Sequence, residues 1–477
     1  MHVLFNRRNL LAAGAAGLAS AALARTLSSD IPTARDFGAI GDGRADDTAA
    51  IRAALAAVPA LRFDEGTYRI TDELRLRSGQ RVELSPGVTI SQHVRGKSAF
   101  VALRAQNVSI DLNGGAVRGP GGWSKLWTGM QGQEGSRGVR FLGCTASHVA
   151  GPGRVYNWGS AAIDITGGSD VECRSVTVEG THLHGRSLDY LDNNQIGIYI
   201  VNDPVYGPAN NIRVSQCEIA GVTQGVLREA LPSPVPTGAT LIDRCVFRDI
   251  PGQHGVYNQE SHVTVTDCQF SRIALSAVKN QSGDAGRVLR NLTATGIVGD
   301  DLGGSLFEVA TPSPHRGGID GIVLEGRGRR VGRLLSVARN VRNLRAVVAG
   351  DTIRGDAVSL DKANLHAIDI SVDARIIAQH GVIVSATNSS GIRIRPKIDQ
   401  ANSYSGRPTT FSGVLVESAS AGVVDLVDAQ ITDPTGKMFY GVFNSIAGSE
   451  VRLSGTTRIS GASSMRVRAT GRVVGLP

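Results

Sequence analysis

A tyrosine and a lysine, Tyr257 and Lys279, occupy the same place in two short apolar runs that lie 22 residues apart. The runs are GVYN at 255–258 and AVKN at 277–280. Side chains alternate between the two faces of a strand, so inward-pointing valines would leave Tyr257 and Lys279 pointing outward. In a stack of parallel strands the two residues would lie about 4.8 Å apart, which is one strand spacing. A phenol beside an amine on an outer face is a pair of groups that can transfer protons.

Two further ionisable residues accompany this pair. His254 directly precedes the first run, and Glu308 takes the outward place on the strand that follows Lys279. His254, Tyr257, Lys279 and Glu308 are therefore the candidate catalytic residues. The same residues also fit a plainer interpretation, in which Lys279 and Glu308 form a surface ion pair of little energetic weight and His254 closes a turn.

The outward place recurs along most of the chain at intervals of 22 to 35 residues, which suit one turn of a solenoid plus variable loops. We expect one continuous solenoid rather than a row of independent domains. Its outward residues form a column: Asp164, Tyr199, Leu227, Tyr257, Lys279, Glu308, Ser336, Ser359, Ile383, Leu415 and Phe443. The column is mostly ionisable or aromatic up to Glu308 and apolar from Ile383 onward. An apolar C-terminal half suits cover by a loop, by the chain's own tail or by a second subunit.

Composition agrees with a chain of many short strands. The sequence has 477 residues, enough for two or three ordinary domains or for one long array. Its 59 glycines and its low aromatic content favour strands joined by tight turns, with little helix. Lys and Arg form no dense patch with interleaved aromatics, so nucleic acid is not an expected partner.

The N-terminus has the features of an export signal. Arg7 and Arg8 precede an apolar run from Leu10 to Ala24, which at about 15 residues is too short for a comfortable membrane span. The segment resembles a twin-arginine signal, so we expect residues 1–24 to be removed, residues 25–33 to be a linker, and the protein to be periplasmic or secreted without a membrane span. The ordinary secretion route and a basic membrane anchor are the alternatives.

Loss of the two signal arginines lowers the formal net charge from +8 to +6. A modest positive balance suits an acidic polymer as partner, although scattered surface arginines would give the same sum.

Four of the five cysteines occur in one recurring pattern, which also suggests stacking. Cys173, Cys217, Cys245 and Cys268 take the same place in that pattern, and Asn291 takes it next. Equivalent places in successive turns lie above one another, so we predict an interior ladder of buried free thiols. Disulfides between neighbouring turns are the alternative for an exported protein.

A short helix is predicted near the start of the solenoid. Apolar residues over 51–58 are spaced for one helix face. The acidic residues before them, Asp42, Asp46 and Asp47, are interpreted as turn and capping residues, with a cation site as the weaker alternative.

This opening resembles the start of the pectate lyase superfamily of right-handed parallel β-helices. The residues that carry the resemblance are Asp36-Phe37-Gly38-Ala39, Gly41-Asp42-Gly43, Asp46-Asp47-Thr48 and Gly66-Thr67-Tyr68. The resemblance implies an all-β, single-stranded right-handed parallel β-helix over residues 34–477, with a cap at residues 34–60 that contains the short α-helix. It does not imply one reaction, because the superfamily includes lyases, hydrolases, epimerases and phage spike proteins.

Long loops in the N-terminal half, at 119–138, 181–195 and 229–238, are expected to wall the binding face. Tryptophans in the first loop suit stacking on sugar rings or packing against the solenoid. Two histidines in the second loop, His182 and His184, would face one way on a strand, which is only a weak metal signal. The candidate substrate-binding residues are Tyr199, Asp164, Gln259, Gln281, Glu229, His184, Trp123 and Trp127.

If the ligand is an acidic polysaccharide, β-elimination is the simplest reaction for these residues. The enzyme must neutralise a uronate carboxylate, remove the neighbouring C–H proton and protonate the glycosidic oxygen. Lys279, Tyr257 and His254 are groups of the required kinds. No cofactor is expected, because the chain shows no acidic cluster of the calcium-binding kind known in pectate lyases.

Hydrolysis is the alternative reaction, and a non-catalytic polysaccharide-binding solenoid is the alternative to both. A hydrolase needs two carboxyls about 5–5.5 Å or about 6.5–9.5 Å apart. Glu229 and Glu308 would lie three turns apart, about 14 Å. The pattern expected from polygalacturonases, Asn-Thr-Asp, then Asp-Asp, then Gly-His-Gly, is absent. The carboxylates considered are Asp164, Asp189, Asp192, Glu229, Glu260 and Glu308.

Overall fold

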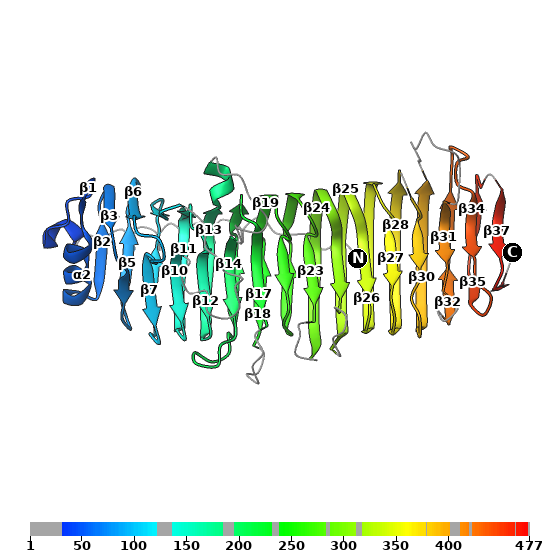
Figure 1. The fold of residues 1–477 in the computed structure, drawn as a ribbon, viewed down its shortest axis with the longest axis horizontal. Coiled ribbons are helices and arrows are strands. Elements are labelled where there is room, and N and C mark those ends of the chain that lie inside the picture. Colours follow the sequence, from blue (N-terminus) through cyan, green and yellow to red (C-terminus); the bar gives the residue numbers. More distant parts are fainter. Residues whose placement is uncertain are drawn as a thin grey trace, which may run out of the picture.

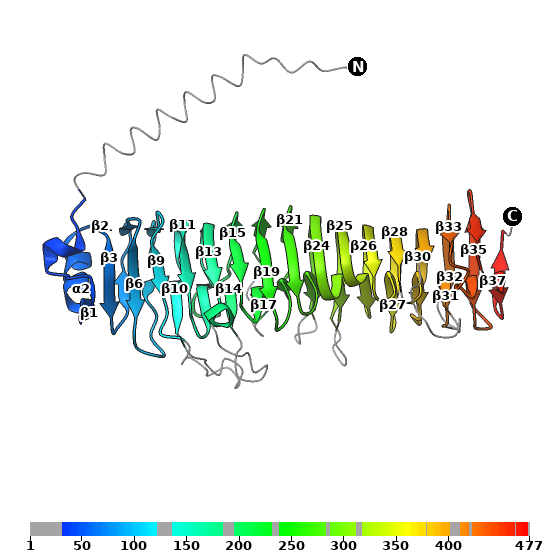
Figure 2. The same ribbon diagram turned by 90° about the horizontal axis from the view of Figure 1, so that it is seen from above.

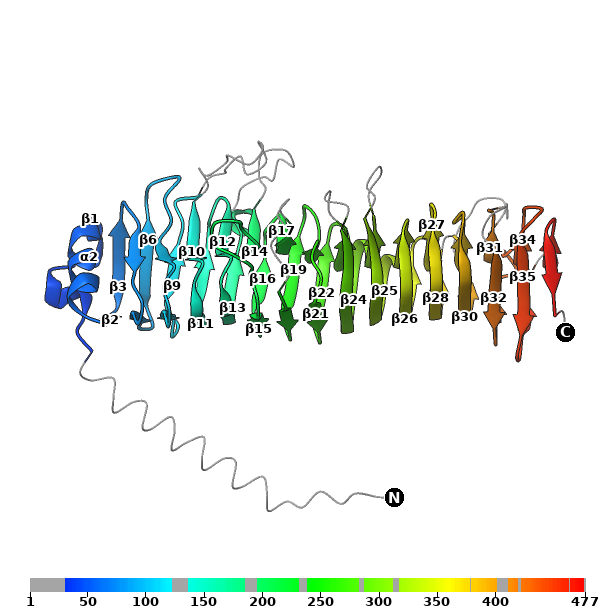
Figure 3. The same cartoon turned by 90° about the horizontal axis from the view of Figure 1, so that it is seen from below.

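The computed structural model describes residues 31–121, 136–184, 195–230, 238–282, 287–311, 317–377, 379–400, 411–418, 422–462 and 464–475. Over these residues the chain winds into one elongated stack of strands, which runs from a small helical end to the last strands (Figure 1). The views from above and from below also show successive turns in the order of the chain (Figures 2 and 3). The expected signal segment, residues 1–24, lies outside the described residues, so its export role stays a prediction.

Each turn contributes a strand to each of three parallel sheets, and the pairings between named strands are all parallel. We call the first the column sheet because it carries the column. Its strands are β4 (Leu74–Leu76), β7 (Phe100–Leu103), β10 (Arg137–Leu142), β12 (Ala161–Thr166), β14 (Ile196–Val201), β17 (Gln224–Glu229), β20 (Val256–Asn258), β23 (Val278–Gln281), the ends of β24 (Val288–Ala310) and β25 (Gly318–Ala338), β27 (Val358–Asp361), β29 (Val382–Val384), β31 (Ser412–Val416), β34 (Tyr440–Asn444) and β37 (Met465–Ala469).

The other two sheets follow the column sheet in each turn. The second sheet contains β2 (Ala60–Phe63), β5 (Arg81–Leu84), β8 (Ser109–Asp111), β15 (Ile212–Ser215), β18 (Thr240–Asp243), β21 (Val263–Thr266), β32 (Val423–Val427), β35 (Glu450–Ser454) and β38 (Arg472–Val474). The third contains β1 (Asp42–Asp46), β3 (Gly66–Ile70), β6 (Val88–Gln92), β9 (Ala116–Arg118), β16 (Glu218–Ala220), β19 (Val246–Ile250), β22 (Gln269–Ile273), β33 (Gln430–Thr432) and β36 (Arg458–Ser460). Strands that bend from the second sheet into the third are β11 (Thr145–Tyr156), β13 (Ser169–Glu179), β26 (Val341–Ile353), β28 (Leu365–Ile376), β30 (Ser390–Gln400), and the earlier parts of β24 and β25.

The interior is filled by side chains that stack from turn to turn. Val256 and Val278 are paired in register and fully buried. Tyr257 and Lys279, the next residues along the same two strands, are only partly buried. On the third sheet, the rings of Phe247 and Phe270 stack with centroids 4.7 Å apart. Along each short strand the side chains alternate between the dry interior and the outer face. This alternation is the reason that the outward residues could be aligned from the sequence.

The N-terminal end is covered by η1 (Ala34–Phe37) and α2 (Thr48–Ala57), as Figure 1 shows. The acidic residues there bond to backbone and hydroxyl groups, which confirms their role in turns but not the predicted side-chain cap of the helix. Asp42 accepts from the N–H of Arg44 at 2.8 Å, and Asp46 accepts from the N–H of Thr48 at 3.1 Å. Asp47 holds the N-cap position but makes no capping bond; its carboxylate instead accepts from the N–H groups of Ile40 and Gly41.

The cysteine ladder is confirmed as a column of buried free thiols, with its register corrected. Cys217, Cys245 and Cys268 do stack in one place. Cys173 instead pairs with Val214, one inward place earlier, and its Sγ lies 3.6 Å from the Sγ of Cys217.

The difference follows from the sharp bend between the second and third sheets. A residue with positive φ forms this bend, and in three turns it directly precedes the cysteine: Gln216, Arg244 and Asp267. In the turn of Cys173 the bend residue is Ser175, two places after the cysteine. The predicted continuation at Asn291 is wrong as well. That residue is exposed with a φ of 54°, and Ile297, after the bend at Gly296, takes the inward place.

The predicted all-β single-stranded parallel solenoid with a short capping α-helix is therefore confirmed. No helix among the described residues is long and apolar enough to cross a membrane.

Candidate functional site

The predicted column exists, and strand pairing places its members in one line. The register steps from Asp164 to Tyr199, Leu227, Tyr257, Lys279 and Glu308, each on the next strand of the column sheet. It continues through Ser336, Ser359, Ile383, Leu415 and Phe443 to Arg468. Toward the N-terminus it begins earlier than predicted, because Arg140 pairs with Asp164.

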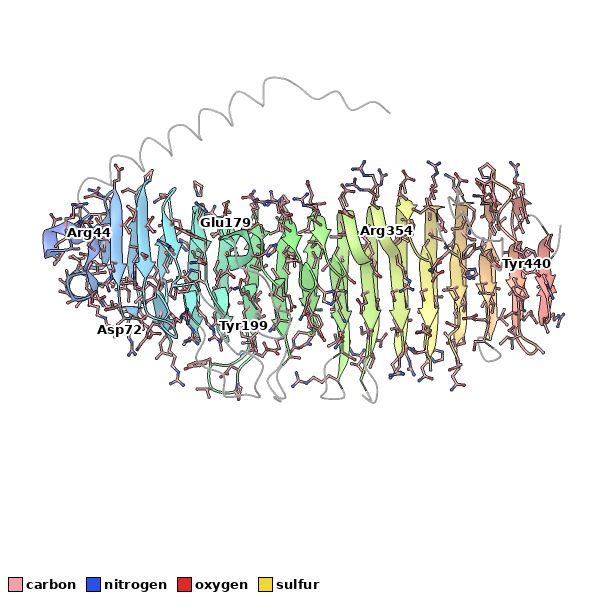
Figure 4. The ribbon with its side chains drawn as sticks, turned by 45° about the horizontal axis from the view of Figure 1, so that its top comes forward. Arg44, Asp72, Glu179, Tyr199, Arg354 and Tyr440 are labelled. Carbon is pink, nitrogen blue, oxygen red and sulfur yellow. The ribbon has the colours of Figure 1, made fainter. Side chains whose placement is uncertain are left out.

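The middle of this column is apolar and aromatic on the outside of the solenoid. Leu227 packs with Ala161 and Ile196 in a small buried cluster that is separate from the core, and the rings of Tyr199 and Tyr257 cover it. Figure 4 shows Tyr199 on a different side of the solenoid from Glu179 and Arg354. Two phenol rings over an apolar patch form a surface on which sugar rings can stack.

Lys279 lies at the end of this patch, between an aromatic ring and a carboxylate. Its Nζ is 5.3 Å from the centre of the Tyr257 ring and 3.0 Å from Oε1 of Glu308. Oε2 of Glu308 accepts from the Ser276 hydroxyl at 2.8 Å. Burial acts to raise the pKa of Glu308, but the charge and hydrogen bond of Lys279, with the Ser276 hydroxyl, outweigh it and hold the pKa below its ordinary value.

His254 lies beside this cluster and is almost fully buried. Its Nδ1 accepts the backbone N–H of Ser276 at 3.1 Å, so the ring is neutral with its proton on Nε2. Burial and the positive charge of Lys279, opposed by Glu308, lower the pKa of His254 to about 4. The histidine therefore presents a hydrogen-bond donor rather than a base at neutral pH.

The same hydrogen bond occurs at a second histidine further along the column sheet. His380 precedes Gly381-Val382 as His254 precedes Gly255-Val256, and its Nδ1 accepts the N–H of Ser412 at 3.0 Å. Burial lowers the pKa of His380 as well, with Asp356 opposing it. The repetition supports the interpretation of His254 as a residue that closes a turn.

Glu229 and Tyr199 form a second polar contact on the face. The Tyr199 hydroxyl donates to Oε2 of Glu229. Burial raises the pKa of Glu229, and burial with the nearby glutamate raises the pKa of Tyr199 far above its usual value. On the following turn, Oε1 of Gln259 accepts the N–H of Ala230 at 3.3 Å, and Gln281 lies half-buried one turn further.

Asp164 is held by two arginines that sequence reasoning missed. Its Oδ2 accepts from Arg137 Nη1 at 2.8 Å and from Arg140 Nε at 2.9 Å, and its Oδ1 accepts from the Thr166 hydroxyl at 2.7 Å. Burial would raise the pKa of Asp164, but the two guanidinium charges hold it below its usual value. Asp164 therefore positions the arginines and presents no open carboxylate. The signal was available in the sequence, since Val139-Arg140-Phe141 repeats the column pattern 24 residues before Asp164.

Glu260 is not on the outer face and is removed from the hydrolase candidates. It is fully buried, where its Oε1 accepts from Asn202 Nδ2 at 3.0 Å and lies 3.5 Å from Arg287 Nη1. Arg228 joins this interior cluster by donating to Asn202 Oδ1 at 2.8 Å. Strand alternation already places Glu260 inward, two places after the inward Asn258, so the sequence pattern could have excluded it.

Several predicted residues lie outside the described part of the chain: Trp123, Trp127, Asp189 and Asp192. His184 lies at the end of η2 (Thr181–His184), a helical turn rather than the strand considered for the His-x-His pair, and its side chain is outside the described part. Among the described residues, no group of three or more His, Cys, Asp or Glu side chains is placed to hold a metal ion.

No protein-family model matches the sequence, and no curated protein matches it. Solved structures do match the fold. An exopolygalacturonase from Thermotoga maritima covers 76% of this chain and 91% of its own, with a TM-score of 0.56 and 12% identity. A family 28 exopolygalacturonase from Yersinia enterocolitica covers 82% and 78%, with a TM-score of 0.53 and 15% identity.

A tailspike protein of E. coli bacteriophage HK620, solved in complex with a hexasaccharide, covers 94% of this chain and 79% of its own, with a TM-score of 0.58 and 11% identity. At these identities the likeness concerns the fold. It confirms the right-handed parallel β-helix that the resemblance to the pectate lyase superfamily implied.

Proposed function

We propose that this protein is an enzyme that cleaves a uronate-containing polysaccharide on the column sheet, by β-elimination. One observation carries the choice of reaction. Each column-side carboxylate that the structure describes between β10 and β24 already bonds to a basic or phenolic group: Asp164 to Arg137 and Arg140, Glu229 to Tyr199, and Glu308 to Lys279. The groups turned toward a ligand are thus cations and phenols, the kinds that elimination needs.

Lys279 and Tyr257 take the central roles in this proposal. The Lys279 ammonium neutralises the uronate carboxylate and so makes the neighbouring C–H proton more acidic. Tyr257, as the phenolate, takes that proton and passes it to the glycosidic oxygen. The carbon–oxygen bond breaks as a carbon–carbon double bond forms in the uronate ring, and the tyrosine returns to its starting state. Glu308 and Ser276 hold Lys279 in place, and His254 offers its Nε2–H beside the Tyr257 ring, 5.5 Å away between ring centres.

Hydrolysis is the second candidate, and Glu229 is the residue that favours it. A carboxyl whose pKa is raised by burial is suited to protonate a leaving oxygen. Two of the three solved structures described above are exopolygalacturonases. Against it, the strand register separates Glu229 and Glu308 by three strand spacings, about 14 Å along the axis, which is beyond the range for paired catalytic carboxyls.

One assay separates the reactions. The full chain is incubated with a panel of acidic polysaccharides and with carboxyl-reduced versions of each, and near-ultraviolet absorbance is followed beside new reducing ends. Absorbing unsaturated products from the acidic polymers alone support elimination. Reducing ends without absorbance contradict elimination and support hydrolysis. Tight polymer binding without new ends contradicts both and supports a binding solenoid.

A further inference from the structure

We propose that Arg137 and Arg140, positioned by Asp164, form a second carboxylate-binding subsite for the same polymer, five turns from Lys279. The inference rests on the proposed acidic polysaccharide as ligand, but not on the reaction. It assigns to the arginines the recognition of a uronate carboxylate at one end of the bound chain, while Lys279 binds another near the other end.

The arginine pair has donors to offer beyond those that hold Asp164. A guanidinium carries five N–H donors in a planar fork. Within the described residues, Arg137 uses Nη1 for Asp164 and Nε for Ser160 at 3.4 Å, and Arg140 uses Nε for Asp164. Their side chains are 12% and 24% exposed, so part of each fork reaches the surface. Such forks match carboxylates in a bidentate manner.

The cluster of Arg137, Arg140 and Asp164 contains more positive than negative charge. Two guanidinium groups share one carboxylate, and that carboxylate is fully buried. The cluster therefore carries a net positive charge on a rigid base, beside an apolar patch that lowers screening by solvent. Asp164 fixes both arginines at once, so it acts as a positioning residue.

A comparison within the chain shows what sets this cluster apart. Asp300 on the third sheet is also shared by two arginines, Arg329 and Arg330. There the aspartate is 33% exposed and the arginines are 63% and 51% exposed. Exposed clusters of that kind are mobile, screened and of little energetic weight. The Asp300 cluster is therefore a matched control with the same residue types away from the proposed binding face.

The strand register gives the distance over which a ligand must extend. Arg140 and Lys279 are joined by five successive pairings, which is about 24 Å along the solenoid. The tyrosine patch around Leu227 lies between them. An extended chain with uronates at both ends of this span would place its sugar rings over the patch and its terminal carboxylates on the two cationic sites. A shorter oligosaccharide could reach only one of them.

The test measures binding of uronate oligosaccharides of increasing length to the full chain by calorimetry at low ionic strength, where surface charges are least screened. For wild type, affinity should rise in a step once the oligosaccharide exceeds the span. Arg140→Gln and Arg137→Gln should each remove most of that step, at least fivefold in Kd for long oligosaccharides, and lower the affinity for short oligosaccharides by a smaller factor. Arg329→Gln should change neither. Carboxyl-reduced oligosaccharides should show no difference between wild type and any variant.

Two outcomes overturn the inference: long oligosaccharides that bind Arg140→Gln as tightly as wild type, or a wild type that binds no acidic oligosaccharide at all. Circular dichroism and thermal melting establish that each variant is folded. Should Arg140→Gln fail to fold, Arg140→Lys keeps the charge without the fork and should show a smaller but measurable loss of affinity for long chains. If polymer is bound in an arginine-dependent manner but gives no unsaturated product, the elimination proposal fails and this subsite stands.

Discussion

The Nζ atom of Lys279 lies 3.0 Å from Oε1 of Glu308, on the adjacent turn of the solenoid. The two side chains are 17% and 26% exposed, so the pair is not the freely solvated ion pair that the sequence allowed as its plainer interpretation. Ser276 joins it to His254 through one hydroxyl and one backbone N–H. Four residues on three turns thus form one connected unit beside the Tyr257 ring.

Replacing Lys279 by alanine should lower kcat at least a hundredfold, about 3 kcal/mol in the barrier. The substitution removes the cation proposed to neutralise the uronate and leaves the Glu308 carboxylate without its partner. The measurement is the initial rate of unsaturated product with saturating polymer. Lys397→Ala is the control, because Lys397 pairs with Asp373 at 2.8 Å on an exposed part of the third sheet. A normal rate for Lys279→Ala would remove this lysine from the mechanism.

Tyr257→Phe should abolish turnover while polymer binding stays within about threefold, which is less than 1 kcal/mol. Phenylalanine keeps the ring that packs on the Leu227 patch and lies under Lys279, and it loses only the hydroxyl. Rates and calorimetric Kd are measured together, with Tyr206→Phe as control, since the Tyr206 ring contacts Arg104 away from this unit. Loss of binding together with turnover would instead assign Tyr257 a packing role.

His254 should make the protein less stable in mild acid. In the folded state its pKa is about 4, whereas in the unfolded chain it has the ordinary histidine pKa of about 6.5. The unfolded chain therefore binds more protons between these values, so the free energy of unfolding falls as the pH drops from about 6.5 toward 4. Over this whole pH range, protonation of His254 lowers the free energy of unfolding by at most about 3 kcal/mol.

Denaturant unfolding of His254→Gln over this pH range checks the expectation. Glutamine keeps an acceptor for the Ser276 N–H but takes up no proton, so stability should fall less steeply with acid than in wild type. His380→Gln should act in the same direction, because burial lowers that pKa as well. Equal slopes for wild type and His254→Gln would contradict the assigned neutral state.

The buried cluster of Arg228 and Glu260 should matter for stability rather than for binding. Both side chains are fully buried; burial lowers the pKa of Arg228 to about 10 and raises that of Glu260. Arg228→Met leaves Glu260 without its interior cation and should cost on the order of 3 kcal/mol of unfolding free energy. The double variant Arg228→Met/Glu260→Gln should recover part of this loss. Arg213→Met, at an exposed position, is the control, and denaturant midpoints are the measurement.

The course of the column could be predicted from sequence because each outward residue stands between two apolar residues that must face a dry interior. The pairings of Tyr257 with Lys279 and of Lys279 with Glu308 follow from that rule alone. The rule also reaches Arg140, which was missed only because the alignment was begun at Asp164.

The errors in the cysteine ladder came from the bends between sheets. Cys173 and Asn291 were assigned wrong places because the left-handed bend residue directly precedes the cysteine in the other three turns but follows Cys173 by two places and Asn291 by five. Glu260 was taken for a surface carboxylate although it lies two places after the inward Asn258, whose Nδ2 donates to the Glu260 carbonyl at 2.8 Å. Ser276 carried no signal, since its role arises from two contacts across turns.

The stacked thiols make the order of winding and oxidation important. Neighbouring strands place the α-carbons of successive ladder cysteines about 4.8 Å apart, within the range that a disulfide can bridge. A chain that met an oxidant while still extended could link these sulfurs in arrangements that no correct turn contains. Once wound, all five are buried, and burial raises the pKa of the Cys144 thiol, which slows its attack on any oxidant. The protein should therefore complete its coil under reducing conditions and carry its sulfurs, already sheltered, into any oxidising surroundings.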